Sequence, residues 1–211
     1  MSRQASRVFI IDDDSSVRKS LARLLGAAGY ETEAFSSAED YLARDTFDGI
    51  ACLILDVRMP GSSGLELQDR LNELGGEPPI VFLTGHGDIP MSVNAIKGGA
   101  INFLTKPVNE DVLLSAVRQA LTLNKKKREN RYSMQKHRAY LSTLTRREYE
   151  VMCYILSGAR NRQIANHLGI TEKTVKAHRA KIMAKMAVSS AVELGSVCTL
   201  LGITPKAITA G

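Results

Sequence analysis

The sequence predicts an α/β domain, with a five-stranded doubly wound parallel sheet, joined to a small all-α domain. Apolar β-rich runs alternate with helical patterns up to about residue 121, whereas no strand pattern is visible from Leu144 onward. Residues 1–124 hold 11 Lys and Arg against 17 Asp and Glu, a net charge of −6. Residues 125–211 hold 17 against 5, a net charge of +12. Such a swing in charge favours two domains with different electrostatic tasks.

Five runs are expected to form the sheet, at 8–11, 31–35, 51–55, 80–84 and 101–104. Several are continuously apolar, which is typical of strands covered by helices on both faces. Between them apolar residues recur at helical spacing, as at Leu113, Val117 and Leu121. Turns that contain Gly or Pro separate the elements. Strict alternation of strand and helix favours the flavodoxin-like strand order of a doubly wound sheet.

The segment 122–141 is expected to be a basic linker, helical or frayed, between a first domain at 1–121 and a second at 142–211. It carries seven Lys or Arg against one Glu and has little apolar periodicity. No Gly or Pro interrupts it, so the preceding helix can continue through it. Downstream, four short helices are expected at 146–157, 161–168, 172–186 and 190–201.

Composition narrows the class of protein. No apolar run approaches the ~18 residues of a membrane-spanning helix, and residues 1–7 lack the apolar core of a secretory signal. We therefore expect a cytoplasmic protein with no membrane partner. Cys52, Cys153 and Cys198 lack metal-ligand spacing, which favours reduced and buried thiols. The net charge of +6 and a pI near 9.3 favour a polyanionic partner.

Polar residues follow the expected strands at the edge where open parallel sheets bind ligands. Aspartates occupy 12–14 after the first strand, and Asp56 follows the third, which neighbours the first in the flavodoxin-like order. Clustered carboxylates repel one another, and a divalent cation with oxygen preference, most naturally Mg²⁺, relieves this repulsion. Thr84 ends the fourth strand and Lys106 follows the fifth, adding a hydroxyl and an ammonium.

Carboxylates, a divalent cation, an ammonium and a hydroxyl together favour a site that accepts a phosphoryl group. A carboxylate attacks phosphorus in line while the cations neutralise the equatorial oxygens. Asp56 is the best nucleophile because it stands alone after a buried strand and faces the acidic pair. For any single carboxylate a turn or cap role is the simpler interpretation, but it does not explain the whole set.

A second interpretation makes Asp12 the nucleophile. Residues 12–16 also fit the motif of haloacid-dehalogenase-type phosphatases. This alternative leaves Asp56 unexplained and needs a further acidic pair on a strand after the lysine, which the sequence lacks. A purely structural binding protein would show neither phosphoryl transfer nor a salt-dependent affinity for DNA.

Residues 7–123 resemble the receiver domain of two-component response regulators. The resemblance rests on residues 8–14, 53–61, 84–85 and 106–107. It implies that Asp56 accepts a phosphoryl group from a sensor histidine kinase. The implied ligands of Mg²⁺ are Asp12, Asp13, Asp56 and the backbone carbonyl of Arg58.

The same resemblance assigns further roles around this site. Thr84 and Lys106 would contact the phosphoryl group, and Phe103 occupies the aromatic switch position. The Lys106–Pro107 bond would be cis, and Asp14 would start a helix. The remaining position, His86, would tune dephosphorylation or be a plain loop residue.

Residues 161–176 have the pattern of a helix-turn-helix. Ala165 is small where two helices cross, Gly169 permits the turn, and Thr171 is a natural N-cap. On the second helix, Val175, Ile182 and Met186 form an apolar stripe opposite Lys173, Lys176, Ala177 and Ala180. Cations and small residues suit entry into the major groove of DNA, although any single lysine also fits a solvated basic face.

Residues 144–148 and 175–178 resemble the LuxR/NarL-type DNA-binding domain, and the resemblance covers about residues 142–205. It implies that Lys176, Ala177 and Ala180 approach base edges and that His178 is a packing residue. The implied phosphate contacts are Arg162, Thr171, Thr174 and Arg179. The last helix corresponds to the dimerisation helix of that family. Packing within its own domain is an equally reasonable role for it. Its apolar face consists of Ala191, Leu194, Val197, Cys198 and Leu201.

The stretch 84–91 together with this output domain resembles the FixJ branch of the family most. The resemblance implies a phosphorylation-dependent transcription regulator, an activator, with no enzymatic activity beyond self-phosphotransfer and self-dephosphorylation. The phosphorylated protein would form a homodimer through a surface near Met91, Ile96 and Ile101. The implied partners are the kinase, promoter DNA and RNA polymerase.

Overall fold

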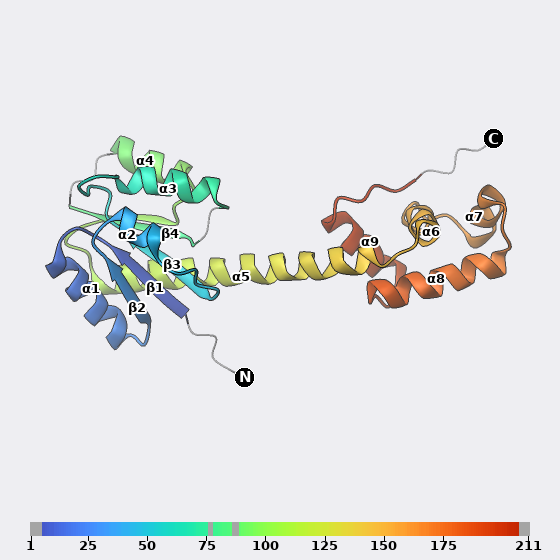
Figure 1. The fold of residues 1–211 in the computed structure, drawn as a ribbon, viewed down its shortest axis with the longest axis horizontal. Helices are drawn as coiled ribbons and strands as arrows, with labels where there is room; N and C mark the ends of the chain where they lie inside the picture. The colour runs from blue at the N-terminus through green and yellow to red at the C-terminus, as the bar shows by residue number, and fades with distance from the viewer. Residues whose placement is uncertain (1–5, 76–77, 86–88, 207–211) are drawn as a thin grey trace. The chain divides into compact units, whose positions relative to one another are not determined.

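The structure is a computed structural model that describes residues 6–75, 78–85 and 89–206. The chain divides into two compact units, Met1–Arg128 and Glu129–Gly211, and Figure 1 labels most of their elements. The strands are β1 (Ser6–Ile11), β2 (Glu31–Phe35), β3 (Ile50–Leu55), β4 (Ile80–Thr84) and β5 (Asn102–Thr105). The helices between them are α1 (Ser15–Ala27), α2 (Ala38–Ala43), α3 (Gly64–Glu73) and α4 (Ile89–Lys97). The helices that follow are α5 (Glu110–Ser142), α6 (Arg146–Leu156), α7 (Asn161–Leu168), α8 (Glu172–Met186) and α9 (Ala191–Leu200).

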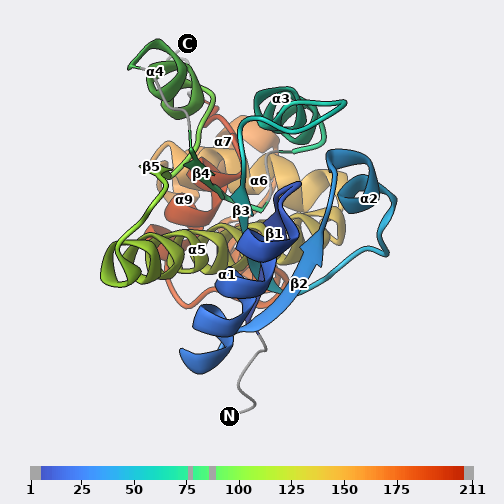
Figure 2. The ribbon, with the colours of Figure 1, turned by 90° about the vertical axis from the view of Figure 1, so that its left-hand side faces the viewer.

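The five strands form one parallel sheet in the order β2-β1-β3-β4-β5, which confirms the predicted topology. Every residue of β3 and β4 is buried, as their continuous apolar runs predicted. One core cluster packs α2, α3 and α4 on one face of the sheet, and a second packs α1 and α5 on the other. Figure 2 shows these two layers of helices around the strands.

The strands lie within two residues of their predicted bounds. β1 begins at Ser6, two residues early, because its backbone pairing with β3 continues past the apolar run. Arg7 belongs to this extension, where it forms ion pairs with Glu31 and Glu33 of β2. The apolar run therefore predicts the buried part of β1, whereas backbone hydrogen bonding determines where the strand begins.

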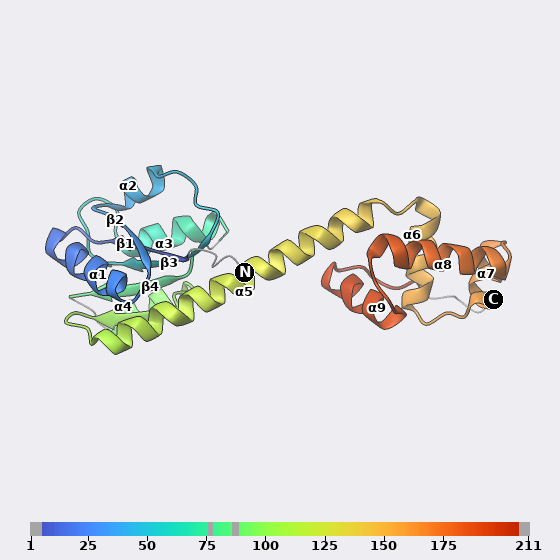
Figure 3. The same ribbon diagram turned by 90° about the horizontal axis from the view of Figure 1, so that it is seen from below.

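The long helix α5 runs unbroken through the segment 122–141 that was expected to be a linker, so the helical alternative holds. Its residues in the first unit extend beyond residue 121. Asn124 is buried against β3, and Arg128 pairs with Asp48. The continuous ribbon is visible in Figure 3.

In the second unit, α6, α7, α8 and α9 pack around one apolar core. The turn between α7 and α8 is made by Gly169, whose φ of +63° is the left-handed conformation that glycine tolerates. Leu194, Val197 and Cys198 of α9 are buried in this core. This face of α9 therefore packs within its own unit, and a role of the helix in dimerisation stays a prediction.

The three cysteines, Cys52, Cys153 and Cys198, are free and buried, as expected. Burial raises the pKa of the Cys52 thiol to about 12 and that of Cys198 to about 11. Among the residues that the structure describes, no single helix is long and apolar enough to cross a membrane. One pair of consecutive helices, α8 and α9, would be long and apolar enough if taken together, but the chain bends by 56° between them.

Candidate functional site

An acidic pocket lies at the carboxyl ends of β1 and β3. These strands are neighbours, and the Asp56 backbone N–H donates to the carbonyl of Ile11 at 2.9 Å. The aspartates that follow the two strands therefore meet. One carboxylate oxygen from each of Asp12, Asp13 and Asp56 lies within 4.8 Å of the others. Asp12 and Asp56 are buried, whereas Asp13 is exposed.

Lys106, just after β5, joins the two buried aspartates. Its Nζ lies 2.5 Å from Oδ2 of Asp12 and 2.7 Å from Oδ2 of Asp56. The other oxygens accept backbone N–H groups: Asp12 Oδ1 from Asp14 at 3.0 Å and Asp56 Oδ1 from Arg58 at 3.2 Å. Both aspartates are thus held in fixed orientations by groups in the segments that follow β1, β3 and β5.

Burial and hydrogen bonding shift the pKa values in this pocket in opposite directions. Burial raises the pKa of Asp12 above its ordinary value, although the hydrogen bond from Lys106 works in the other direction. Burial alone would lower the pKa of Lys106, but its hydrogen bonds to Asp12 and Asp56 leave that pKa raised. One ammonium against three clustered carboxylates leaves an excess of negative charge, and hard carboxylate oxygens are the donors that Mg²⁺ prefers. The residues present therefore fit a divalent cation.

A cation from α1 supports the acidic loop. Nη1 of Arg18 donates to the backbone carbonyls of Asp12 and Asp13, at 2.5 and 2.9 Å. The side chain of Asp14 accepts from Ser16 and Val17 and so caps α1, as predicted. The sequence interpretation missed Arg18. The available signal was a cation in the first turn of a helix, where the helix dipole disfavours positive charge.

On the other side of the pocket, α3 begins close to Asp56. A Cβ on Gly64 would lie 2.2 Å from the carbonyl oxygen of Asp56, so only glycine allows this approach. Gly64 also donates its N–H to Val57 at 2.9 Å, and Ser63 with Glu66 forms a capping box at the start of α3. The requirement for Gly64 was not predicted.

Thr84 and Phe103 flank the pocket on β4 and β5. Thr84 is buried, and its carbonyl accepts the N–H of Lys106 at 2.8 Å. Phe103 is half-buried, with its ring centroid 6.0 Å from that of Phe82 on the paired position of β4. The Lys106–Pro107 bond is cis, as the resemblance implied. The predicted dephosphorylation-tuning residue, His86, lies outside the described residues.

The basic face of α8 has the predicted arrangement. Val175, Ile182 and Met186 are fully buried. Every candidate DNA contact is at least partly accessible: Arg162, Thr171, Lys173, Thr174, Lys176, Ala177 and Ala180 are exposed, and Arg179 is half-buried. Thr171 caps α8 by accepting the N–H of Thr174 at 3.1 Å. The predicted packing residue, His178, is half-buried.

A part-buried ion pair holds the start of α6 to α8. Nζ of Lys185 lies 2.6 Å from Oε2 of Glu148 and donates to the carbonyl of Thr143 at 2.9 Å. The hydrogen bond from Lys185 keeps the pKa of Glu148 at about 2. Glu148 also accepts the N–H of Thr145 in a capping box. The sequence interpretation did not identify this pair, since its members are 37 residues apart.

A five-stranded parallel sheet with an acidic pocket and a lysine at its carboxyl edge, followed by a basic helix-turn-helix unit, defines a class of protein: a receiver domain joined to a DNA-binding domain. Comparison with known families agrees. Residues 8–118 match the response regulator receiver domain, and residues 142–198 match the luxR family of bacterial regulatory proteins.

Known relatives are similar over almost their whole length. The response regulator protein TodT of Pseudomonas putida is 46% identical over 194 residues, which cover 92% of this chain and 86% of TodT. The transcriptional regulatory protein FixJ of Rhizobium meliloti is 38% identical over 201 residues, covering 94% and 98%. A solved structure of the response regulator StyR has a TM-score of 0.83 at 46% identity, covering 92% and 98%. The chain belongs to the LuxR family of response regulators.

This membership makes the protein a transcription regulator with a receiver domain and a LuxR-type DNA-binding domain. A receiver implies a histidine kinase as partner, and a LuxR-type domain implies DNA. The relatives are transcriptional regulators and not classical enzymes, which speaks against the phosphatase alternative with Asp12 as nucleophile.

Proposed function

We propose that this response regulator is a transcription activator switched on by phosphorylation of Asp56. A sensor histidine kinase supplies the phosphoryl group, and Mg²⁺ is held by Asp12, Asp13, Asp56 and the carbonyl of Arg58. The observation that carries the proposal is the position of Lys106 Nζ, within 2.7 Å of both buried carboxylates. This arrangement provides a nucleophile, a metal-binding set and a positive charge in one pocket.

In the proposed transfer, a carboxylate oxygen of Asp56 forms a bond to phosphorus. The P–N bond of the kinase phosphohistidine breaks, and the imidazole nitrogen takes the electron pair. Arg58 N–H and Lys106 hold the Asp56 carboxylate in a fixed orientation, so little reorganisation is needed. A bound Mg²⁺ supplies charge neutralisation at the phosphoryl oxygens. Water later cleaves the acyl phosphate, which gives the slow self-dephosphorylation.

The proposed switch begins at Thr84 and Lys106. The Lys106 ammonium contacts a phosphoryl oxygen, and the Thr84 hydroxyl moves toward the same group. Phe103 lies on β5, which pairs with β4, and its ring then packs further inward. The surface of α4 and β5 changes as a result, and there Ile89 and Ile96 are exposed. Useful switching requires a bias of about 1–3 kcal/mol between the two states.

The output of the proposed switch is a homodimer on promoter DNA. Two recognition helices would occupy two half-sites. Lys176, Ala177 and Ala180 would read base edges, with Lys173 on the same face. The phosphate contacts would be Arg162, Thr171, Thr174 and Arg179. Activation would bring RNA polymerase to the promoter, in the cytoplasm.

Sedimentation with and without a phosphoryl mimic tests the proposed dimer. The mimic is beryllofluoride with Mg²⁺, and Asp56→Asn is the control. We expect the wild-type mass to double and the variant to stay unchanged. Identical wild-type masses in both conditions would contradict phosphorylation-driven dimerisation and favour relief of inhibition between the domains.

A further inference from the structure

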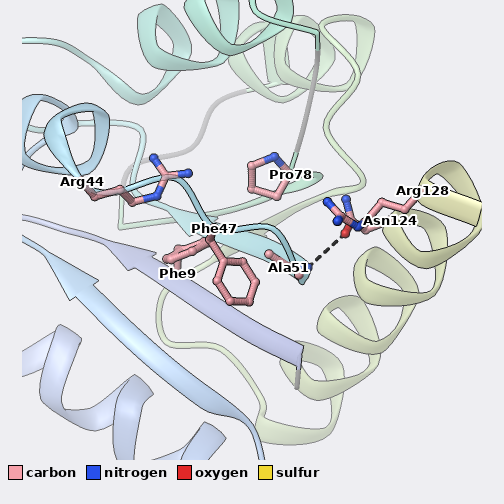
Figure 4. Close-up of a pocket in the computed structure, with 8 residues that line it drawn as sticks. Phe9, Arg44, Phe47, Ala51, Pro78, Asn124 and Arg128 are labelled. Carbon is pink, nitrogen blue, oxygen red and sulfur yellow. Dashed lines mark hydrogen bonds between the residues drawn. The ribbon is translucent and has the colours of Figure 1, made fainter. Parts of the chain in front are cut away.

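Asn124 is a polar residue at a core position of α5. Leu113, Val117 and Leu121 form the face by which α5 packs on the sheet, and Asn124 continues that face with only 2% of its surface exposed. Its Oδ1 accepts the backbone N–H of Ala51 in β3 at 3.0 Å. Figure 4 shows this contact between the helix and the strand.

The hydrogen bond has a structural cause in the unequal lengths of two strands. β3 begins at Ile50, but its pairing with β4 begins only at Leu53 opposite Ile80. The Ala51 N–H therefore lies beyond the start of β4, although Ala51 is buried. A buried N–H needs an acceptor, and Asn124 supplies it. Asn124 thus caps the overhanging start of the strand that carries Asp56 at its other end.

One turn further along α5, Arg128 pairs with Asp48 in the loop before β3. Asn124 and Arg128 line the same small cavity of about 90 Å³, together with Arg44, Phe47 and other residues (Figure 4). The buried residues of α5 end at Asn124. Asn124 and Arg128 therefore anchor the end of the buried face of this helix on the first unit.

The stretch that follows buries little of its surface. Residues 125–127 and 129–133 are exposed. Residues 125–128 are four consecutive cations, whose like charges repel, and the single carboxylate of Glu129 offsets only part of this charge. A short exposed helix is marginal in water, because most helical stability in proteins comes from packing. Packing resumes at Tyr140 and Leu141, against the core of the second unit.

We propose that Asn124 is a positioning residue that, by capping β3, keeps α5 helical across residues 125–133 and so makes DNA affinity respond to the receiver. The second part rests on the proposed function. A stiff helix can carry a change in the receiver to the DNA-binding unit, whereas a frayed segment would act as a flexible tether.

Amide hydrogen exchange of the full chain tests the anchor. Asn124→Leu removes the acceptor with little change in size, whereas Asn124→Asp keeps an acceptor oxygen there, with its charge one turn from the cation of Arg128. Thr122→Ala is the matched control, because the Thr122 hydroxyl makes an exposed bond within the helix, to the Arg118 carbonyl.

In the leucine variant, amides at 125–133 should exchange about tenfold faster, as expected for the loss of one buried hydrogen bond. Amides at 113–121 should stay protected, and the aspartate and alanine variants should resemble wild type. Equal exchange at 125–133 in wild type and the leucine variant would overturn the anchor. So would a uniform loss of protection over 113–133, since it would mean general destabilisation of the unit.

DNA affinity tests the coupling, with a duplex that the wild-type protein selects from a random pool. We expect acetyl phosphate to tighten binding in wild type and Asn124→Asp, and to change it less than twofold in Asn124→Leu. Labelling of Asp56 should be equal in all three proteins. An undiminished response in Asn124→Leu would overturn the coupling. Absence of labelling in wild type would instead contradict the proposed function, and the exchange result would still decide the anchor.

Discussion

The ammonium of Lys106 lies 2.7 Å from Oδ2 of Asp56, and the same ammonium lies 2.5 Å from Oδ2 of Asp12. The contact places a cation from the end of β5 next to a carboxylate from the end of β3. In the proposed transfer the ammonium is already beside the carboxylate that attacks phosphorus. Its role is electrostatic, so removing its charge should affect the reaction more than the fold.

Lys106→Met should slow labelling of the protein by a small phosphodonor. The lost interaction is a charge-assisted hydrogen bond worth ~1.5–3 kcal/mol, which corresponds to roughly 10- to 150-fold in rate. Labelling rates of wild type and variant provide the measurement. Lys19→Met, an exposed lysine in α1, is the control and should react at the wild-type rate. Equal rates for Lys106→Met and wild type would exclude this role.

Mg²⁺ should stabilise the protein through the acidic pocket. At a free concentration ten times its dissociation constant, binding to the native state adds ~1.4 kcal/mol to the free energy of unfolding. Asp13→Asn should lose most of this gain, and because Asp13 is exposed its fold should survive. Denaturant titrations with and without Mg²⁺ check this, with the exposed loop substitution Asp45→Asn as control. An equal gain in Asp13→Asn and wild type would place the ion elsewhere.

Glu148→Gln should destabilise the DNA-binding unit in a pH-dependent manner. The pKa of Glu148 is lowered from 4.5 to about 2, so its stabilising charge is fully present above pH 4.5 and is lost as the pH falls toward 2. The variant should lose ~2 kcal/mol at pH 7, and the loss should shrink steadily below pH 4.5. Urea unfolding at several pH values measures it.

Glu150→Gln serves as the comparison for that series. Glu150 pairs with Arg147 at 3.0 Å in a partly exposed position, where ion pairs contribute ~0–1 kcal/mol. Its loss at pH 7 should therefore be smaller than that of Glu148→Gln. A difference between wild type and Glu148→Gln that stays constant from pH 7 to pH 2 would contradict the role of the Glu148 charge.

Lys176→Ala should reduce sequence specificity in DNA binding. If Lys176 reads bases, the variant should lose ~1–3 kcal/mol on selected DNA and less on random DNA. Titrations with both duplexes at one salt concentration provide the comparison, and Lys19→Ala on α1 is the control. Equal losses on the two duplexes would mean that Lys176 is a backbone contact.

The sheet and the acidic pocket could be predicted because they depend on short-range patterns. The buried strands β3 and β4 are mostly continuous apolar runs; Asp56 directly follows β3, and Thr84 is the last residue of β4. Once the strand order is inferred, the carboxyl ends of β1 and β3 must be adjacent, so Asp12 and Asp56 must meet. Lys106 follows from the same argument for β5.

Contacts between distant segments could not be read in this way. Glu148 and Lys185 are 37 residues apart, and no local pattern pairs them. Asn124 occupies a position that spacing assigns to the core, but its partner Ala51 becomes visible only when β4 is seen to start late. The role of the apolar stripe on α9 stayed open for a related reason, because such a stripe fits a partner chain and its own core equally well.

Intact-mass measurement of the full chain with acetyl phosphate tests the central claim that Asp56 accepts a phosphoryl group. Wild type should gain the mass of one phosphoryl group in the presence of Mg²⁺ and none after chelation, and Asp56→Asn should gain none in either condition. Labelling that persists in Asp56→Asn and disappears in Asp12→Asn would contradict the account and make Asp12 the nucleophile.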